Sequence, residues 1–230
     1  MKLIFIHGSG SCGDAWHYQT KHFPDADAVS LPGHPDGEPR TSIEGYVDWL
    51  RDYIRRQSYR DVVLAGHSLG SAIAQLHALE HADDLKALIL IGAGARLRVH
   101  PMYIEALEKA RTDPSIMETM TQANDDLVEP DYAEMMRRRS LQIGPAVFLN
   151  DMLCCDRFDV MDRVHQIKLP TLVVCGTEDV MTPPKYARYL TDKIEGSTEV
   201  IIPGGTHRVF AEKPDEVNRA IDEFVQRLPS

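Results

Sequence analysis

The sequence is poor in cysteine and has no long apolar run. Its 230 residues include 4 cysteines, and none of these forms the C-x-x-C spacing of a metal or redox motif. Four thiols in a chain of this size do not make a disulfide scaffold, so we expect all of them to be reduced. No stretch approaches the roughly 20 apolar residues that span a membrane. The composition therefore excludes a disulfide-stapled domain and predicts no membrane partner.

Positive charge is also scarce. The chain has 25 lysines and arginines against 35 aspartates and glutamates, which gives a formal charge of −10 at pH 7. This balance disfavours nucleic acid and anionic membranes as partners and favours a small molecule. The first apolar run, residues 2–6, is too short for the apolar region of a signal peptide, so we expect a cytoplasmic protein. The sequence leaves the oligomeric state open.

Strand-like apolar runs alternate with helical patterns along most of the chain. We expect strands at residues 2–6, 26–31, 61–66, 86–92, 170–175 and 198–202, and helices at 14–22, 42–57, 68–81, 183–192 and 213–228. Such alternation is typical of a parallel sheet with helices on both faces. Two helix starts carry a local signal, because Thr41 with Glu44 makes a capping-box pattern and Pro214 occupies a first-turn position.

The most specific motif is Gly66-His67-Ser68-Leu69-Gly70, which has the form G-x-S-x-G between an apolar run and a helical pattern. A serine at such a sharp strand-to-helix turn is held in strained backbone geometry, and its hydroxyl stands clear of the sheet. Ser68 is therefore a candidate nucleophile. Because a serine hydroxyl is a poor nucleophile at neutral pH, it needs a histidine base and a carboxylate that orients this base.

Candidates for both partners of Ser68 follow downstream. Asp179 comes after the expected strand at 170–175, and His207 comes after the expected strand at 198–202. All three residues thus lie just past the carboxyl end of a strand, where open α/β sheets bind their ligands. The order serine, acid, histidine is the order that accompanies a G-x-S-x-G turn. Glu178 is the competitor for the acid role.

With these motifs the chain resembles the α/β-hydrolase superfamily over essentially its whole length. The segment LIFIHGSG at residues 3–10 adds a strand that ends in a His-Gly loop. The resemblance implies that the backbone N–H groups of Ser9 and Leu69 form an oxyanion hole, which stabilises the negative oxygen of a tetrahedral intermediate. It also selects Asp179 over Glu178, because the family places a glycine three residues before the acid.

The resemblance defines the expected fold as α/β, a mostly parallel, doubly wound sheet of about six strands with a helical cap insertion. Relatives usually begin with an antiparallel hairpin, which is lacking here because residues 2–6 form the first strand. Between residues 93 and 168 the strand signals stop, and prolines separate several helical segments. We therefore expect a core of residues 1–93 and 168–230, and a cap of residues 94–167 over the active site.

The expected cap is rich in methionine, a residue that fills irregular apolar surfaces. These methionines either pack the cap on the core or line an apolar acyl or aryl pocket, and the candidates for substrate binding are Met117 and Met136. Arginines at residues 96, 98 and 137–139 also allow two interpretations, a solvated charged face or a site for an anionic substrate.

The resemblance implies a serine hydrolase that cleaves carboxylic esters of small, apolar substrates through an acyl-enzyme intermediate. In that scheme Ser68 attacks, His207 acts first as base and then as acid, and Asp179 fixes the imidazole tautomer. No metal or organic cofactor is needed. A C–C bond hydrolase, a lactonase, a thioesterase or a cofactor-free perhydrolase would use the same residues. A slow-turnover ligand receptor and a non-catalytic scaffold are the alternatives from other classes.

Overall fold

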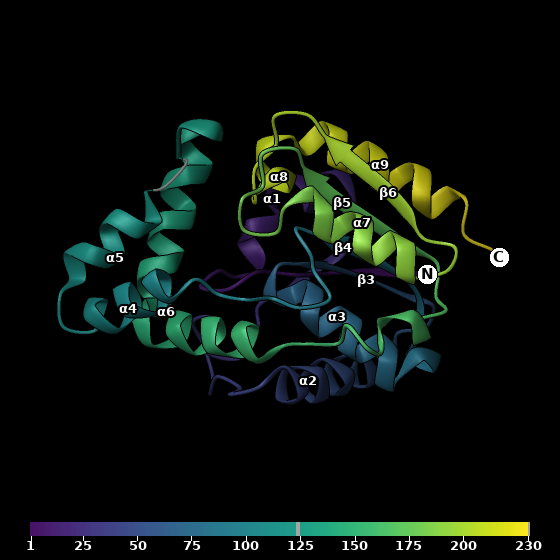
Figure 1. Cartoon of the computed structure of the whole chain (residues 1–230), viewed down its shortest axis with the longest axis horizontal. Helices are drawn as coiled ribbons and strands as arrows, with labels where there is room; N and C mark the ends of the chain where they lie inside the picture. The colour runs from purple at the N-terminus through teal and green to yellow at the C-terminus, as the bar shows by residue number, and fades with distance from the viewer. Residues whose placement is uncertain (123–124, 230) are drawn as a thin grey trace.

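A six-stranded sheet forms the centre of the protein (Figure 1). The computed structural model describes residues 1–122 and 125–229. The strands are β1 (Lys2–Ile6), β2 (Asp27–Val29), β3 (Val62–His67), β4 (Leu85–Ile91), β5 (Thr171–Gly176) and β6 (Thr198–Ile202). They lie in the order β2-β1-β3-β4-β5-β6, and all neighbouring pairs are parallel. The predicted six-stranded parallel sheet is confirmed.

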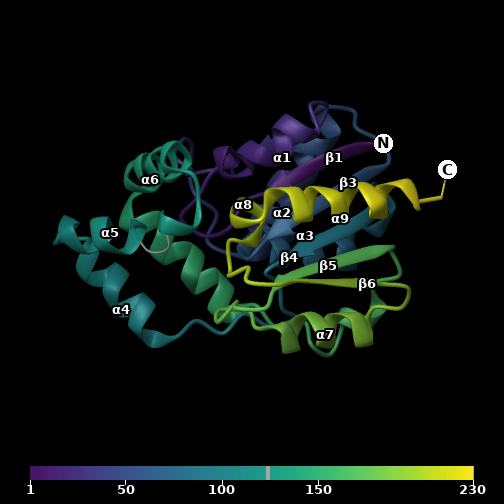
Figure 2. The ribbon, with the colours of Figure 1, turned by 90° about the horizontal axis from the view of Figure 1, so that it is seen from above.

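Helices cover both faces of this sheet (Figure 2). One face packs against α2 (Ile43–Arg56), α3 (Leu69–Glu80) and α7 (Pro184–Lys193), and the other against α1 (His17–His22), α8 (Val209–Glu212) and α9 (Pro214–Gln226). Successive strand residues point to opposite faces. In β1, Ile4 and Ile6 belong to the first layer of the core, whereas Leu3 and Phe5 belong to the second.

Most predicted helices are present, with two local differences. The pattern at 14–22 divides into a short 3-10 helix, Gly13–Trp16, followed by α1. The capping-box prediction at Thr41 is wrong: the extended residue Ser42 precedes α2, and its hydroxyl oxygen accepts the Gly45 N–H at 3.1 Å. Since a helix N-cap must lie directly before the first helical residue, the start of α2 at 43 leaves Thr41 one position too early. Pro214 is the first residue of α9, as predicted.

The chain between β4 and β5 forms α4 (Pro101–Ala110), α5 (Pro114–Thr121) and α6 (Pro130–Arg157), which lie together at the carboxyl end of the sheet (Figures 1 and 2). We refer to these three helices as the α4–α6 segment. Helix α6 bends at Gly144, where φ is +80°, and Pro145 follows. Prolines in a helix interior break the hydrogen-bond ladder, so the bend has a local cause.

Other short 3-10 helices connect these elements, at Ala82–Asp84, Asp125–Leu127 and Val164–Gln166. Along the described residues, every helix is too short or too polar to cross a membrane.

Candidate active site

Ser68 stands at the junction of β3 and α3 in a backbone conformation that side chains rarely adopt, with φ +51° and ψ −113°. Such strain costs on the order of 1–3 kcal/mol and persists only where the surroundings enforce it. Here the surroundings are tightly packed backbone. A Cβ on Gly70 would lie 2.2 Å from the carbonyl oxygen of Ile6, and one on Gly66 would lie 2.2 Å from that of Gly70. The two glycines of the motif are therefore required by the close approach of β1, β3 and α3.

Asp179 lies in the loop after β5, with its side chain buried. Its Oδ1 accepts the backbone N–H groups of Met181 and Thr182 at 2.9 and 2.8 Å, and its Oδ2 accepts the Thr182 hydroxyl at 2.7 Å. Oδ2 also lies 2.9 Å from Nδ1 of His207. Burial favours the neutral acid, but the hydrogen bonds from His207 and Thr182 outweigh it and lower the pKa of Asp179. The carboxyl group is therefore charged and fixed in direction.

His207 lies in the loop after β6, and its two ring nitrogens have different surroundings. Because Nδ1 faces the charged Asp179, it carries a proton and donates a hydrogen bond to the carboxylate. Nε2 is therefore the basic nitrogen of the ring. Within the described part of the chain, Nε2 is buried and has no hydrogen-bond partner. Nε2 and the Ser68 hydroxyl are not hydrogen-bonded to each other here, and catalytic contacts of this kind often tighten only when substrate binds.

His67, the residue before Ser68, supports the backbone of His207. Its Nε2–H donates to the carbonyl oxygen of His207 at 2.9 Å. Burial, together with the electrostatic interaction with the neighbouring His207 ring, lowers the pKa of His67 to about 3. The ring of His67 is therefore a neutral donor at ordinary pH and holds the His207 loop against the Ser68 turn.

The loop after β1 passes directly beside Ser68. A Cβ on Gly8 would lie 2.7 Å from Nδ1 of His67 and 3.3 Å from Cβ of Ser68. Ser9 follows in this loop and lines the same cavity as Ser68. Leu69 is the first residue of α3, so its N–H has no acceptor within the helix. Both residues predicted for the oxyanion hole are thus neighbours of Ser68.

Two cavities of about 320 Å³ each meet at Ser68 and His207. The first lobe lies toward α4 and is lined by apolar residues that include Leu97, Val99 and Val180. The second lobe lies beside the β1 loop and is lined by residues that include Met136, Phe148 and Phe210. The residues shared by both lobes are Ser68, Tyr103, Met152, Met181 and His207.

The structure separates the two methionines predicted to bind substrate. Met136 lines the second lobe and is also packed on the core. Met117 lines neither lobe and is buried in a hydrophobic cluster inside the α4–α6 segment. Its burial in that cluster supports the alternative, packing role for Met117, and a contact with substrate stays a prediction. Glu178 is exposed and Asp179 is buried, which places only the latter beside His207.

Most of the arginines considered for an anion site have acidic or carbonyl partners. Arg137 and Arg138 pair with Glu134, and Arg139 pairs with Asp14 at 2.6 Å. Arg98 donates to a backbone carbonyl at 3.4 Å. Arg138 and Arg139 thus belong to a charged face, whereas Arg98 also lines the first lobe and Arg137 the second.

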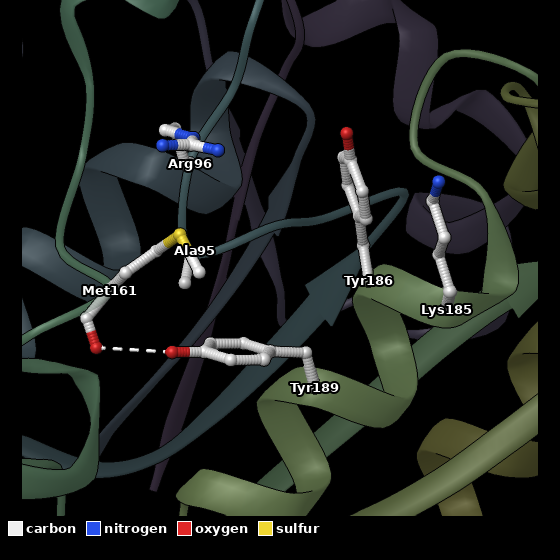
Figure 3. Close-up of a pocket in the computed structure, with 6 residues that line it drawn as sticks. All are labelled: Ala95, Arg96, Met161, Lys185, Tyr186 and Tyr189. Atoms are coloured by element: carbon white, nitrogen blue, oxygen red, sulfur yellow. Dashed lines mark hydrogen bonds between the residues drawn. The ribbon is translucent and has the colours of Figure 1, made fainter.

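Arg96 lines a separate cavity of about 240 Å³ (Figure 3). Its guanidinium lies 3.6 Å from the carboxylate of Asp159. The hydroxyl of Tyr189 donates across this cavity to the carbonyl oxygen of Met161 at 3.3 Å (Figure 3). Ser68 and His207 do not line it, so this cavity is distinct from the two lobes.

Two residues with roles in this site were not singled out from the sequence. Thr182 donates to Asp179, and its position three residues after an aspartate and before a proline is a recognisable turn signal. Asp151, in α6, accepts the Gly10 N–H at 2.9 Å. A single acidic residue within a helical pattern gives no comparable signal. Among residues 1–122 and 125–229, no three His, Cys, Asp or Glu side chains lie together so as to hold a metal ion.

The chain belongs to the Alpha/beta hydrolase family, whose sequence pattern matches residues 3–220. It is similar to the (E)-2-((N-methylformamido)methylene)succinate hydrolase of Acinetobacter baylyi, with 24% identity over 243 residues that cover 99% of this chain and 91% of the relative. It is also similar to the pimeloyl-(acyl-carrier protein) methyl ester esterase of Neisseria meningitidis, with 24% identity, 98% of this chain and 77% of the relative covered. A solved structure described as a thermophilic esterase has 32% identity and a TM-score of 0.82, with 98% and 89% covered.

Proposed function

We propose that the protein is a serine hydrolase that cleaves carboxylic esters of small, apolar molecules through an acyl-enzyme intermediate. The observation that carries this proposal is the buried Asp179–His207 pair, with a contact of 2.9 Å and the basic Nε2 of His207 left without a partner. Ser68 lies at the edge of the same cavity in a strained turn. The relatives named as esterases support the same reaction class.

In the proposed mechanism, the Ser68 hydroxyl transfers its proton to Nε2 of His207 while Oγ forms a bond to the ester carbonyl carbon. The tetrahedral intermediate then collapses, the bond to the alcohol oxygen breaks, and His207 returns the proton to the leaving alcohol. Water repeats the sequence on the acyl-enzyme and releases the acid. Asp179 holds the tautomer that leaves Nε2 basic and stabilises the imidazolium that forms twice in each cycle. No cofactor takes part in these steps.

The backbone N–H groups of Ser9 and Leu69 are the donors proposed for the oxyanion. Loss of one such donor costs about 3–4 kcal/mol of transition-state stabilisation where it has been measured. The tight packing of Gly8 against Ser68 supports this assignment, because it brings the loop that carries Ser9 next to the Ser68 turn.

We also propose that the chain consists of a catalytic core, residues 1–93 and 168–230, and a cap, residues 94–167, of which residues 123–124 lie outside the described residues. The α4–α6 segment supports this division because it has a hydrophobic cluster of its own. It also contributes Tyr103 and Met152 to both lobes. In this arrangement the cap selects the substrate, and Met136 belongs to the selecting surface.

The test is turnover of a panel of p-nitrophenyl esters from acetate to laurate, with lactones and thioesters of matched acyl groups. An esterase should reach kcat on the order of 10 s⁻¹ with its best ester, the typical value for enzymes. A fluorophosphonate probe should label the wild-type protein and not Ser68→Ala, since labelling requires an activated serine. A single stoichiometric burst without turnover would instead identify a slow-turnover receptor, and no labelling would identify a non-catalytic scaffold.

A further inference from the structure

A buried carboxylate lies next to the oxyanion loop and takes no part in the proposed mechanism. Asp151, in the second half of α6, is fully buried. Its Oδ2 accepts the backbone N–H of Gly10 at 2.9 Å and lies 2.8 Å from Nε2 of His34. Its Oδ1 accepts the Tyr46 hydroxyl at 3.1 Å. Buried carboxylates are costly unless they are fully hydrogen-bonded, and this one has three donors from three different parts of the chain.

The partner His34 carries a proton on each ring nitrogen. Its Nδ1 lies 3.2 and 3.1 Å from the carbonyl oxygens of Leu31 and Pro32, which only accept. Its Nε2 faces the carboxylate of Asp151. Burial opposes this charge, but the hydrogen bond and the charge of Asp151 raise the pKa of His34. The contact between His34 and Asp151 therefore fixes the direction of Oδ2 toward Gly10.

Gly10 is held by α6 on three sides. Besides the bond from its N–H to Asp151, its carbonyl oxygen accepts the Ser140 hydroxyl at 3.0 Å. The Phe148 ring occupies the space where a side chain would project, because a Cβ on Gly10 would lie 2.5 Å from it. Gly10 also has φ +62°, which favours glycine. Next to it, the Ser9 hydroxyl lies 3.5 Å from Sγ of Cys155, one helical turn beyond Asp151.

We propose that Asp151 is a positioning residue for the oxyanion hole: by holding the Gly10 N–H, it fixes the plane of the Ser9–Gly10 peptide and thereby restrains the adjoining Gly8–Ser9 peptide, whose N–H faces the substrate oxygen. This inference rests on the proposed function, in which Ser9 supplies an oxyanion donor. It also connects the α4–α6 segment to catalysis, because a shift of α6 moves both Asp151 and the loop that it holds.

The test compares Asp151→Leu with the matched control Tyr46→Phe. The leucine removes the acceptor for Gly10 and keeps the branched shape with the same number of side-chain heavy atoms. The control removes the hydroxyl bonded to Oδ1 in the same buried network and leaves the Gly10 contact intact. Asp151→Leu should lower kcat by about 10- to 100-fold with little change in KM, less than the 10²–10³-fold loss for a deleted oxyanion donor. Tyr46→Phe should retain wild-type kcat.

Asp151→Asn keeps the size of the side chain and an oxygen for Gly10, so it should restore most of the kcat lost in Asp151→Leu and provides a folded variant if the leucine is not tolerated. A trifluoromethyl ketone, which forms an oxyanionic adduct with the serine, supplies the second readout. Its inhibition constant should rise across the variants by the same factor by which kcat/KM falls, as for a transition-state analogue. The inhibition constant of the product acid should stay constant.

Equal losses in Asp151→Leu and Tyr46→Phe would overturn the inference in favour of a structural role for the whole network. An Asp151→Asn variant as impaired as the leucine variant would overturn it as well, because the acceptor for Gly10 would then not be the feature that matters. A wild-type protein without ester turnover or serine labelling would instead contradict the proposed function itself. Normal turnover in wild type and in Asp151→Leu would contradict only the inference.

Discussion

Oδ2 of Asp179 lies 2.9 Å from Nδ1 of His207, while Glu178, one residue earlier, is exposed to solvent. Successive loop side chains diverge, so only one of the two acids can reach the ring. The Thr182 hydroxyl and two backbone N–H groups hold the carboxylate of Asp179 from its other sides. The pair is thus fixed before any substrate binds, which is the arrangement that an orienting acid requires.

Replacing each acid by its amide tests this relationship. Asp179→Asn keeps the packing but favours the wrong tautomer of His207, a change that costs about 10⁴-fold in kcat in the serine-protease template. Glu178→Gln is the matched control and should have nearly normal kcat, because its side chain is exposed and lies away from the ring. The measurement is kcat for the best ester of the panel. Reversed outcomes would make Glu178 the orienting acid.

Removal of the proposed nucleophile or of the proposed base should abolish the covalent route. Ser68→Ala and His207→Ala should each lower kcat by several orders of magnitude, and the double variant should be no worse than either, because the residues act as a unit. Both variants should show the wild-type circular dichroism spectrum. Ester hydrolysis within tenfold of wild type in either variant, after contaminating activity is excluded, would remove these residues from the mechanism.

The pH dependence of kcat/KM should report one essential base. Only a neutral imidazole accepts the Ser68 proton, so log(kcat/KM) should fall with a slope of one as the solution is made acidic. The lowered pKa of Asp179 keeps its carboxylate charged over this range, and His67, with a pKa of about 3, stays neutral. A profile that stays flat down to the pH at which the protein unfolds would contradict the base role. A slope of two would require a second titrating group.

The parts of the fold that were predictable from the sequence depend on local patterns. Each strand is a short apolar run followed by a turn, so all six strands were found, with the shortest, β2, differing most from its predicted range. The Ser68 turn was recognisable because close backbone contacts require glycine at both flanking positions. Asp179 was selected over Glu178 by the family resemblance, which implies a glycine three residues before the acid, and the structure places Asp179 beside His207.

The contacts made by α6 could not be predicted from local sequence patterns. Asp151 and Gly10 are 141 residues apart, and their hydrogen bond depends on the bend at Gly144 and on how α6 packs over the sheet. The directions of Met117 and Met136 depend on the same packing, since both are buried but only Met136 lines a lobe. The hydrophobic periodicity of a helix identifies its buried face but does not identify the residues that this face contacts.

Buried histidines should make the fold sensitive to acid. His77, in α3, has a pKa lowered to about 4 by burial, and its Nε2 lies 3.6 Å from Asp84, beyond hydrogen-bond reach. Below about pH 6.5 the unfolded chain binds a proton that the native protein does not, so stability falls as pH falls toward 4. For this residue, linkage gives a loss of about 2 kcal/mol between pH 7 and pH 5. Urea unfolding of His77→Met should show a correspondingly smaller loss, and identical pH dependence in both proteins would contradict the assignment.

The two buried methionines of the α4–α6 segment form a matched pair for the test of substrate selection. Met136 lines the second lobe beside Ser68, whereas Met117 is buried in the cluster with Leu107 and Leu149. Met136→Ala enlarges the lobe, so the ratio of kcat/KM for long and short acyl esters should rise by about 10-fold or more, since each added methylene in an apolar pocket is worth about 1–3 kcal/mol. Met117→Ala should leave that ratio unchanged and lower the free energy of unfolding by about 2–5 kcal/mol, as expected for a buried methionine. If Met117→Ala alone changed the chain-length preference, the α4–α6 segment would select substrate through its internal packing, and Met136 would be a packing residue only.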